Sequence, residues 1–166
     1  MNEAWEVRGG AADGLSGTRE ATVRRMIEAD VKIVARLERE TFSSPWSADT
    51  FLRLMAGKGA EIWVIDIEAE GVVGYAVLWC VLDHGELANI AVDPGHRNKG
   101  LGSLLLDRVV ERSAMVGVRN LYLEVRASNE RAADLYERRG FREIGRRRNY
   151  YDQPREDARV LVKELP

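Results

Sequence analysis

The sequence predicts a single domain of the mixed α/β class, built from layers of helices and sheet. Its 166 residues, 45% hydrophobic and 31% charged, have the balance of a soluble globular chain that is long enough to bury a core. The hydrophobic pattern switches between strand-like runs and helical spacing in a definite order: strand, two helices, three strands, helix, strand, helix, two strands. No internal repeat or linker interrupts this order, so we expect one folding unit.

The N-terminal part is predicted to hold a tail, a first strand and a first helix. Residues 1–20 are rich in glycine, alanine and charge without periodicity, so we expect a flexible tail followed by one domain over residues 21–166. ATVRRM (21–26) is expected to be a short strand, and Asp30 is expected to cap the helix that follows. Four residues of that helix follow helical spacing: Val31, Val34, Leu37 and Glu38.

A break, a second helix and three strands come next. The segment SSPWS (43–47) stops the first helix, and a second helix is predicted to begin at Ser47. EIWVIDIEAE (61–70) and VVGYAVLWCVL (72–82) are joined by a Glu-Gly turn, which predicts an antiparallel pair. ELANIAV (86–92) predicts a third strand, which ends at an Asp-Pro dipeptide.

The C-terminal half alternates helices and strands. A glycine-rich loop leads into a helix that we expect to end near Met115, with Gly117 as its stop signal. Four elements are predicted after it: a strand over 119–125, a helix over 128–140 that starts at a Ser-Asn cap, and strands over 141–151 and 156–165.

Charge and cysteine content exclude several classes of protein. The net charge of −2 argues against a protein held to nucleic acid by its overall charge. With two histidines and one cysteine, Cys80, the chain forms no internal disulfide and is expected to hold no metal. No apolar run approaches the roughly 20 residues that span a bilayer, and the N-terminus lacks the apolar stretch of a signal peptide. We therefore expect a cytoplasmic protein without a membrane partner.

The stretch HRNKGLGSLL (96–105) places two glycines and two cations directly before a run of leucines. Unpaired N–H groups and the helix dipole make such a helix start a favourable site for an anion. The stretch fails the P-loop pattern because Leu101 stands where lysine is needed, and it fails G-x-G-x-x-G because residue 105 is leucine. From the spacing alone, it fits both a helix start with surface cations and a cradle for an oxygen-rich ligand.

Arg-x-x-Gly-x-Gly after the strand NIAV resembles the acetyl-coenzyme A motif of the GNAT superfamily of N-acetyltransferases, and the order of elements is similar to that fold. Four longer segments are similar to one branch, the bacterial ribosomal-protein-alanine N-acetyltransferases: FSSPWS, NIAVDPGHRNKGLGSLLL, LYLEVRASNERAADLYERRGF, and RRNYY with REDARVL. The resemblance covers residues 22–164. It implies a central mixed, mostly antiparallel sheet of about seven strands flanked by about four helices.

The resemblance implies that acetyl-coenzyme A (acetyl-CoA) is the acetyl donor and that the glycine-rich loop binds its pyrophosphate. Backbone N–H groups of six residues are implied: Asn98, Lys99, Gly100, Leu101, Gly102 and Ser103. The cations Arg97 and Lys99 suit the adenosine phosphates but are replaceable as point charges, and relatives often carry another basic residue where this chain has Asn98. The pantetheine arm is implied to lie along the backbone at the end of the strand NIAV: Ile90, Ala91 and Val92.

Three further residues match catalytic or coenzyme-contacting positions of the family. Strand alternation in LYLEV puts Glu124 on the face opposite the apolar residues, where the residues alone indicate a surface cross-strand pair and the resemblance implies the general base. Tyr136 reads as an ordinary core tyrosine, yet it matches the residue proposed as general acid toward the coenzyme A thiolate. Asn129 matches a coenzyme-contacting asparagine and is also suited to cap the helix after it.

The substrate side is expected around FSSPWS, the loop at 83–84 and RRRNYYD. There, Trp46, Tyr150 and Tyr151 either form the walls of a groove for an extended peptide or pack as ordinary aromatic residues. The target of the resembled family is the N-terminal alanine of the small-subunit ribosomal protein numbered eighteen, and some relatives acetylate N-termini more broadly.

Three other functions stay open from the sequence. An acetyltransferase of lysine side chains or small amines needs an acidic pocket, which is opposite in sign to RRRNYY. A non-catalytic acyl-CoA-binding module needs neither Glu124 nor Tyr136. An RNA-binding module lacks net positive charge and a stacking platform here, so we expect no direct recognition of nucleic acid. His84 and His96 are expected to be surface loop histidines rather than bases.

Overall fold

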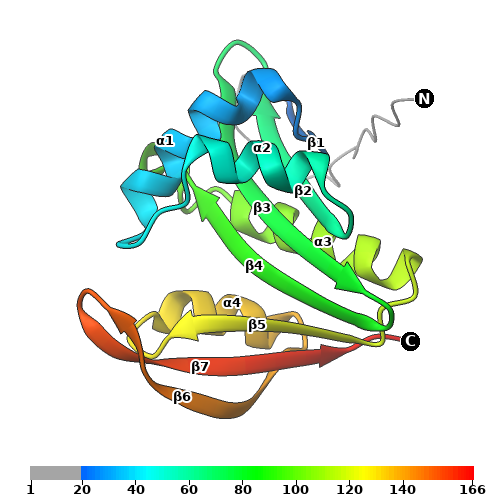
Figure 1. Cartoon of the computed structure of the whole chain (residues 1–166), viewed down its shortest axis with the longest axis vertical. Helices are drawn as coiled ribbons and strands as arrows, with labels where there is room; N and C mark the ends of the chain where they lie inside the picture. The colour runs from blue at the N-terminus through cyan, green and yellow to red at the C-terminus, as the bar shows by residue number, and fades with distance from the viewer. Residues whose placement is uncertain (1–19) are drawn as a thin grey trace, which may run out of the picture.

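The computed structural model describes residues 20–166 (Figure 1). The tail predicted over residues 1–20 lies outside the described residues, apart from Glu20. The α-helices of this part are α1 (Val31–Thr41), α2 (Ala48–Ala56), α3 (Leu101–Met115) and α4 (Glu130–Arg138). The strands are β1 (Ala21–Arg25), β2 (Ala60–Ile67), β3 (Gly71–Val81), β4 (His84–Val92), β5 (Asn120–Arg126), β6 (Arg142–Asp152) and β7 (Arg155–Glu164). Short 3-10 turns, Glu28–Asp30 and Pro94–His96, lie before α1 and α3.

Within residues 20–166, the seven strands form one sheet in the order β1-β2-β3-β4-β5-β7-β6. Every neighbouring pair is antiparallel except β4 with β5, which is parallel because α3 crosses over between them. The mixed α/β class and the mostly antiparallel sheet predicted from the sequence are confirmed.

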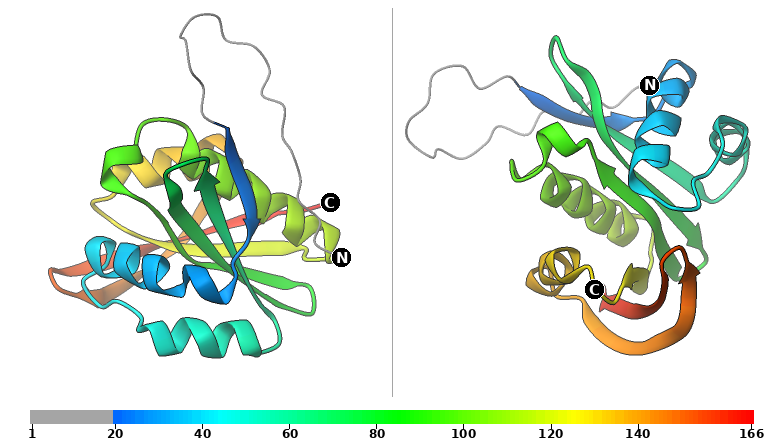
Figure 2. Two further views of the ribbon diagram at one scale, coloured as in Figure 1. Left: turned by 90° about the horizontal axis from the view of Figure 1, so that it is seen from above. Right: turned by 90° about the vertical axis from the view of Figure 1, so that its left-hand side faces the viewer.

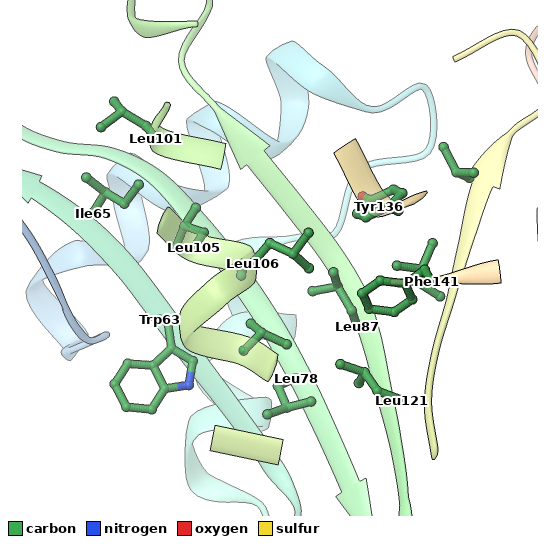
Figure 3. Packing of buried hydrophobic residues seen from close by; sticks show 14 of the residues in the cluster. Trp63, Ile65, Leu78, Leu87, Leu101, Leu105, Leu106, Leu121, Tyr136 and Phe141 are labelled. Atoms are coloured by element: carbon green, nitrogen blue, oxygen red, sulfur yellow. The ribbon is translucent and has the colours of Figure 1, made fainter. Parts of the chain in front are cut away.

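Helices cover both faces of the sheet. As Figures 1 and 2 show, α1 and α2 lie on one face, and α3 and α4 lie on the other. The core under α3 and α4 includes Leu105, Leu106, Leu121 and Phe141 (Figure 3). The core under α1 and α2 includes Val34, Leu37, Phe51 and Tyr75. Because both faces are covered, β3 reads as a nearly continuous apolar run, with buried residues pointing to both sides.

The strands β4 and β5 lie side by side at one end and diverge at the other (Figure 1). Their parallel register joins His84–Leu87 to Asn120–Leu123 and ends there. At the same point, the pairing of β4 with β3 skips Ala88, which forms a β-bulge. Beyond the bulge, the edge of β4 that faced β5 has no strand partner among the described residues, so its backbone groups are open to another molecule.

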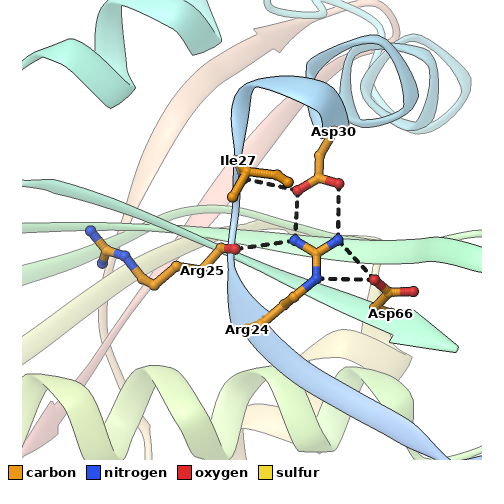
Figure 4. A network of polar contacts seen from close by, with 5 residues as sticks. All are labelled: Arg24, Arg25, Ile27, Asp30 and Asp66. Atoms are coloured by element: carbon orange, nitrogen blue, oxygen red, sulfur yellow. Dashed lines mark hydrogen bonds and ion pairs between the residues drawn. The ribbon is translucent and has the colours of Figure 1, made fainter. Parts of the chain in front are cut away.

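Asp30 stands at the N-cap position of α1, but its side chain does not cap the helix as predicted. Its carboxylate binds the Arg24 guanidinium at 2.7 and 3.0 Å and accepts the Ile27 N–H at 2.9 Å (Figure 4). Burial alone raises the pKa of Asp30, yet the hydrogen bonds from Arg24 and Ile27 outweigh it and leave that pKa lowered. A two-pronged ion pair satisfies the carboxylate better than one helix N–H, so the expected cap does not form.

The predicted helices and strands are all present, with small shifts at their ends. The largest shift is in β2, which ends at Ile67, three residues before the predicted end at residue 70, because residues 68–70 turn toward β3. Over residues 20–166, no helix is both long and apolar enough to cross a membrane.

Candidate functional site

A cleft of about 830 Å³ opens where β4 and β5 part. Its walls come from the end of α1, the α1–α2 loop, β4, the loop before α3, the start of α3, β5, α4 and the end of β6. The structure brings nearly all of the predicted site residues to this cleft: Trp46, Ile90, Ala91, Val92, Arg97, Asn98, Gly100, Leu101, Gly102, Ser103, Glu124, Asn129, Tyr136, Tyr150 and Tyr151. Lys99 is the exception, because its side chain is exposed and does not line the cleft.

One end of the cleft is formed by the loop before α3 and by the first turn of that helix. Gly100 is the N-cap residue, and its φ of +79° lies in the left-handed region that favours glycine. No side chain caps α3. The Leu104 N–H donates to the Gly100 carbonyl oxygen at 3.1 Å. The N–H groups of residues 101–103 are therefore uncapped, and the helix dipole adds positive partial charge there, which together favour an anion.

Gly102 lies in the first turn of α3, and the surrounding protein leaves room for a larger side chain there. A Cβ at this position meets only the Leu135 side chain, at 3.8 Å, which is an ordinary contact. The residue nevertheless lines the cleft. The space that a methyl group would fill is therefore left on the cleft side of the helix, where a ligand can approach the backbone.

Four arginines line the cleft: Arg97, Arg131 and Arg138, together with Arg126 of β5. Arg97 donates from Nε to the carbonyl oxygen of Val92 at 3.0 Å, which ties the loop to the end of β4. Arg131 donates to the Asn98 side chain, which ties the same loop to α4. The sequence reasoning missed Arg131 and Arg138, because only the packing of α4 beside the loop brings their charge to the cleft.

The middle of the cleft follows the open edge of β4. Residues 90–92 come after the point where β5 leaves, so alternate N–H and C=O groups of this stretch face the cleft. On another wall, the Asn129 side chain caps α4 by accepting the Ala132 N–H at 3.2 Å. The Asn129 side chain therefore caps α4 and also lines the cleft.

Glu124 projects into the cleft from β5 because it alternates with apolar residues that point into the core under α3 and α4. Its Oε1 accepts from Nε of Arg147 at 2.9 Å, and Arg147 lies on β6, beyond the directly neighbouring strand β7. The Tyr150 hydroxyl also hydrogen-bonds to this carboxylate, which raises the pKa of Tyr150 to about 12. The carboxylate is 19% exposed and lines the cleft, so it is reachable from the cleft although it is paired across the sheet with Arg147.

Tyr136 borders the cleft from α4, with its ring buried edge-on against Phe141 at 5.8 Å. Its hydroxyl has no hydrogen-bond partner among residues 20–166. Burial and the nearby Tyr151 raise the pKa of Tyr136 well above its ordinary value, so the hydroxyl stays protonated. A protonated and unpaired O–H on the cleft wall is a hydrogen-bond donor for whatever atom lies beside it.

Aromatic side chains line another part of the cleft. The rings of Tyr150 and Tyr151 meet edge to face at 5.1 Å, and Trp46 lines the same cleft from the α1–α2 loop. The two tyrosines follow an irregular stretch of β6, where the register with β7 shifts between Arg147 and Tyr151 and where Asn149 has a φ of +51°. Such bulges redirect side chains, which is how an exposed strand turns these two rings toward the cleft.

Arg126, at the end of β5, joins three parts of this wall. Its guanidinium lies 4.1 Å from the centre of the Tyr151 ring and donates to Ser43 Oγ of the α1–α2 loop at 2.9 Å. It also donates to the carbonyl oxygens of Gln153 and Pro154 in the β6–β7 turn, at 3.0 and 3.2 Å. One side chain thereby connects β5, the α1–α2 loop and the β6–β7 turn, although no motif pointed to it.

The two histidines occupy different surroundings. His84 is exposed at the start of β4, and neither it nor Asp83 lines the cleft, so the expectation that this loop borders the substrate side is not met. His96 lies on the cleft wall, and its ring contacts Glu70 at 2.7 Å and Asp93 at 3.1 Å. The hydrogen bond to Glu70, followed by that to Asp93, raises the pKa of His96. His96 is therefore a loop histidine, as expected, and its two carboxylate contacts fasten the loop before α3.

Residues 31–141 match the model of the acetyltransferase (GNAT) family, and this range holds the open edge of β4, the loop before α3, Glu124 and Tyr136. The chain belongs to the GNAT family. A ribosomal protein bS18-alanine N-acetyltransferase of Escherichia coli strain K12 is 36% identical over 144 residues, which are 85% of this chain and 95% of that relative.

Solved structures share the GNAT fold with this chain. The crystal structure of the ribosomal-protein-S18-alanine N-acetyltransferase from Escherichia coli has a TM-score of 0.79 at 35% identity, over 87% of this chain and 94% of that one. Arabidopsis thaliana NAA60 in complex with acetyl-CoA has a TM-score of 0.78 at 20% identity, over 87% of this chain and 98% of that one. The second likeness, at such low identity, shows the fold alone. The family resemblance read from the sequence is confirmed, and the protein is a GNAT acetyltransferase.

One cleft residue of this GNAT acetyltransferase, Glu38 of α1, was predicted only as a position of helical spacing. It is fully buried, with 0% of its surface exposed, and it borders the cleft. The signal in the sequence was a charged residue among otherwise apolar positions of the inward face of the helix. A buried charge is costly unless it is bonded, so such a residue points to a dedicated set of partners.

Proposed function

We propose that this acetyltransferase moves the acetyl group of acetyl-CoA onto the N-terminal α-amine of a protein, namely the N-terminal alanine of the small-subunit ribosomal protein bS18. The observation that carries the proposal is the meeting of an uncapped helix start, a reachable carboxylate and an unpaired tyrosine hydroxyl in one cleft. A helix start alone binds a ligand, whereas the carboxylate and the hydroxyl add a base and an acid. The choice of substrate is supported by the name of the relative that is 36% identical.

The acetyl donor fits the end of the cleft at α3. Its pyrophosphate accepts from the backbone N–H groups of residues 98–103, and the space left by Gly102 allows the close approach. Arg97 and Arg131 stand beside the phosphates as positive charges. The pantetheine arm carries amide groups that pair with the open edge of β4 at residues 90–92, in the manner of an added strand.

Glu124 is the general base in this proposal. An α-amine has an ordinary pKa of about 7.7–8.0 against about 10.4 for lysine. Near neutral pH, roughly a tenth of α-amines are therefore uncharged, compared with fewer than about one lysine in a thousand. The base then needs only to take the proton that the attacking nitrogen releases, which a glutamate does directly or through one water.

The reaction is a direct transfer. The neutral nitrogen attacks the thioester carbon, a C–N bond forms, and the carbonyl oxygen takes up negative charge, which N–H groups of the open β4 edge stabilise. The C–S bond then breaks and its electron pair goes to sulfur, while Glu124 accepts the proton from nitrogen. The Tyr136 hydroxyl, unpaired and protonated, donates a hydrogen bond to the departing thiolate.

Full proton transfer from Tyr136 to sulfur comes late. Ordinary pKa values of about 10 for tyrosine and about 8.5 for a thiol make that transfer uphill by about 2 kcal/mol. Burial raises the pKa of Tyr136 further, which increases this cost. Hydrogen bonding therefore supplies the stabilisation during C–S cleavage, and the proton follows as the product separates.

The peptide end lies between the aromatic residues Trp46, Tyr150 and Tyr151, which give an extended N-terminus flat surfaces to pack against. The arginines near these rings are each paired with a carboxylate, Arg126 with Glu156 and Arg147 with Glu124. Carboxylates paired in this way are not free to bind a polyamine or another small polycation, which favours a protein N-terminus with one amine as the substrate. A ribosomal-protein substrate also implies that the enzyme works in the cytoplasm.

The test compares two peptides of the same length, one that begins with a free alanine and one whose α-amine is blocked but which carries a free lysine. Release of the coenzyme A thiol is expected with the first and not with the second, and mass spectrometry of the first should find the acetyl group on the terminal nitrogen. Equal rates with both peptides, or binding of acetyl-CoA without any thiol release, contradicts the proposal.

A further inference from the structure

Glu38 joins three separate parts of the molecule under the cleft. Its Oε1 accepts the backbone N–H of Trp46 in the α1–α2 loop at 2.9 Å. Both of its oxygens accept from the Asn89 side-chain amide of β4, at 3.0 Å each. Its Oε2 also accepts from the Tyr75 hydroxyl of β3. One carboxyl group therefore ties α1, the loop after it and two central strands together.

These bonds explain how a fully buried carboxyl group is tolerated. Removing a carboxylate from water costs several kcal/mol unless hydrogen bonds replace the lost hydration. Here three donors do so, and burial together with the nearby Glu38 raises the pKa of Tyr75, which keeps its hydroxyl protonated and donating. A plain apolar side chain is the simpler choice for a helix face in a core, so this polar group serves something other than packing.

Two of the groups held by Glu38 belong to the cleft itself. Trp46 is a wall residue of the proposed peptide site. Asn89 directly follows Ala88, the residue that forms the bulge where β4 leaves β5. The peptide wall and the strand that faces the thioester are therefore held to the same two oxygen atoms, which fixes the distance between them.

We propose that Glu38 is a positioning residue for the acceptor side of this acetyltransferase: it holds the Trp46 loop and the β4 bulge in register with each other, so that the peptide amine meets the thioester. The inference rests on the proposed function, since it concerns the same cleft. It assigns no chemical step to Glu38, whose oxygens are already occupied by Trp46, Asn89 and Tyr75.

The proposal predicts that loss of Glu38 affects the peptide substrate and acetyl-CoA differently. The pyrophosphate end of the cleft is built from the start of α3, the loop before it and α4, none of which bonds to Glu38. At the pantetheine edge, residues 90–92 follow Asn89, but their backbone is held by the pairing of β4 with β3 and does not depend on Glu38. Loss of Glu38 is therefore expected to leave acetyl-CoA affinity unchanged while the peptide is bound poorly and held out of line. A misplacement of reacting groups by about 1 Å costs up to about a hundredfold in rate, so a loss of about tenfold or more in kcat/KM is expected.

The experiment uses Glu38→Ala, Glu38→Gln and a matched control, Asp30→Asn. Asp30 is also a buried carboxylate in a hydrogen-bond network, but it bonds to Arg24 and Ile27, away from the cleft (Figure 4). Each variant is assayed for unfolding temperature, acetyl-CoA affinity, and peptide KM and kcat with the alanine peptide, at a temperature where circular dichroism reports a folded protein.

Glu38→Ala is expected to raise the peptide KM and lower kcat, with acetyl-CoA affinity within twofold of wild type. Glu38→Gln is expected to recover part of the loss, because the amide keeps one oxygen for the Trp46 N–H and its NH₂ group bonds to Asn89 once that side chain turns over. Asp30→Asn is expected to lower the unfolding temperature without raising the peptide KM.

Two outcomes overturn the inference while leaving the proposed function intact. In the first, folded Glu38→Gln and Glu38→Ala keep the wild-type peptide KM and kcat. In the second, Asp30→Asn changes these constants as much as the Glu38 variants do, which assigns the effect to lost stability. If Glu38→Ala does not fold, Glu38→Gln and Asn89→Ala carry the same comparison. A wild-type enzyme that ignores the alanine peptide contradicts the proposed function instead.

Discussion

Arg147 of β6 donates from Nε to Oε1 of Glu124 of β5 at 2.9 Å, which holds the carboxylate from a strand that is not its neighbour in the sheet. Arg147 is 60% exposed and Glu124 19% exposed, so the pair stands at the mouth of the cleft, where water screens it. Its contribution to stability is therefore small. We expect the ion pair instead to orient the Glu124 carboxylate, and enzyme kinetics can measure this effect.

The first prediction concerns this pair. Glu124→Gln is expected to lower kcat by about a hundredfold or more, the usual contribution of a general base, while acetyl-CoA affinity stays within about twofold. Arg147→Gln is expected to lower kcat by a smaller factor, because it removes only the orientation of the base. Steady-state kinetics with the alanine peptide measure both effects.

The control for this prediction is the double variant. If Arg147 acts through Glu124, Arg147→Gln has no further effect on kcat in the Glu124→Gln background. Independent, additive losses contradict that assignment and indicate that Arg147 contacts the substrate itself.

The second prediction is that replacing Tyr136 lowers the activity without lowering the stability. Its hydroxyl is unpaired among the described residues, so Tyr136→Phe removes no hydrogen bond of the protein and leaves the unfolding temperature equal or slightly higher. The same change is expected to lower kcat, because the thiolate loses its donor. A clear drop in unfolding temperature contradicts the environment described for the hydroxyl, and an unchanged kcat contradicts its role.

The third prediction uses Gly102. Alanine stabilises a helix relative to glycine by about 0.5–1 kcal/mol, and the Cβ meets only Leu135 at an ordinary distance, so Gly102→Ala is expected to raise the stability. Acetyl-CoA is expected to bind more weakly, because the methyl group stands where the pyrophosphate approaches. Isothermal titration and thermal unfolding read out the two opposite changes. If Gly102→Ala binds acetyl-CoA as tightly as the wild type or more tightly, this glycine does not make room for the donor.

The fourth prediction is a pH dependence at His96, whose pKa is raised by its hydrogen bonds to Glu70 and Asp93. Because the folded-state pKa lies above the ordinary value of about 6.5, the stabilisation is fully present below about pH 6.5 and is lost as the pH rises through the folded-state pKa. The difference in unfolding temperature between wild type and His96→Gln is therefore expected to shrink with rising pH. His84→Gln is the matched control, since His84 is exposed and away from the cleft. A constant or growing difference contradicts this assignment.

The elements of the fold were predictable because hydrophobic periodicity and turn residues are local signals. The alternation in LYLEV, for example, correctly put Glu124 on the face opposite the core residues of β5. Asp30 failed as a cap for a reason outside its own segment, because Arg24 offers a two-pronged partner that no local pattern reveals. Sequence spacing predicts helix ends well only where no distant charge competes for the capping side chain.

The candidate site was predictable where a motif surrounds it and hidden where distant segments converge. The motif around Gly100 pointed to the loop and also to Lys99, which the fold turns away from the cleft. Apart from the Trp46 N–H, which is eight residues from Glu38, the partners of Glu38 and Arg126 lie tens of residues away, up to 83 for the contact of Arg126 with Ser43. Arg126 looks like an ordinary charged position along the sequence and becomes visible only when the chain is folded. Glu38 stands out as a charge on an otherwise apolar helix face, but only the folded chain shows its partners.

The parting of β4 from β5 has a consequence for how the enzyme is built. In the strand ladder, the two halves of the sheet are joined by four residue pairs, from His84 with Asn120 to Leu87 with Leu123, in addition to the shared core and the contact of Arg126 with Ser43. In the absence of donor, the amide protons on the open side of β4 exchange with solvent, since no strand covers them. In the proposed binding mode, pantetheine takes the place of the missing stretch of strand and bridges the halves. We therefore expect the cosubstrate to complete the sheet beside the peptide site, which favours an ordered mechanism with acetyl-CoA binding first.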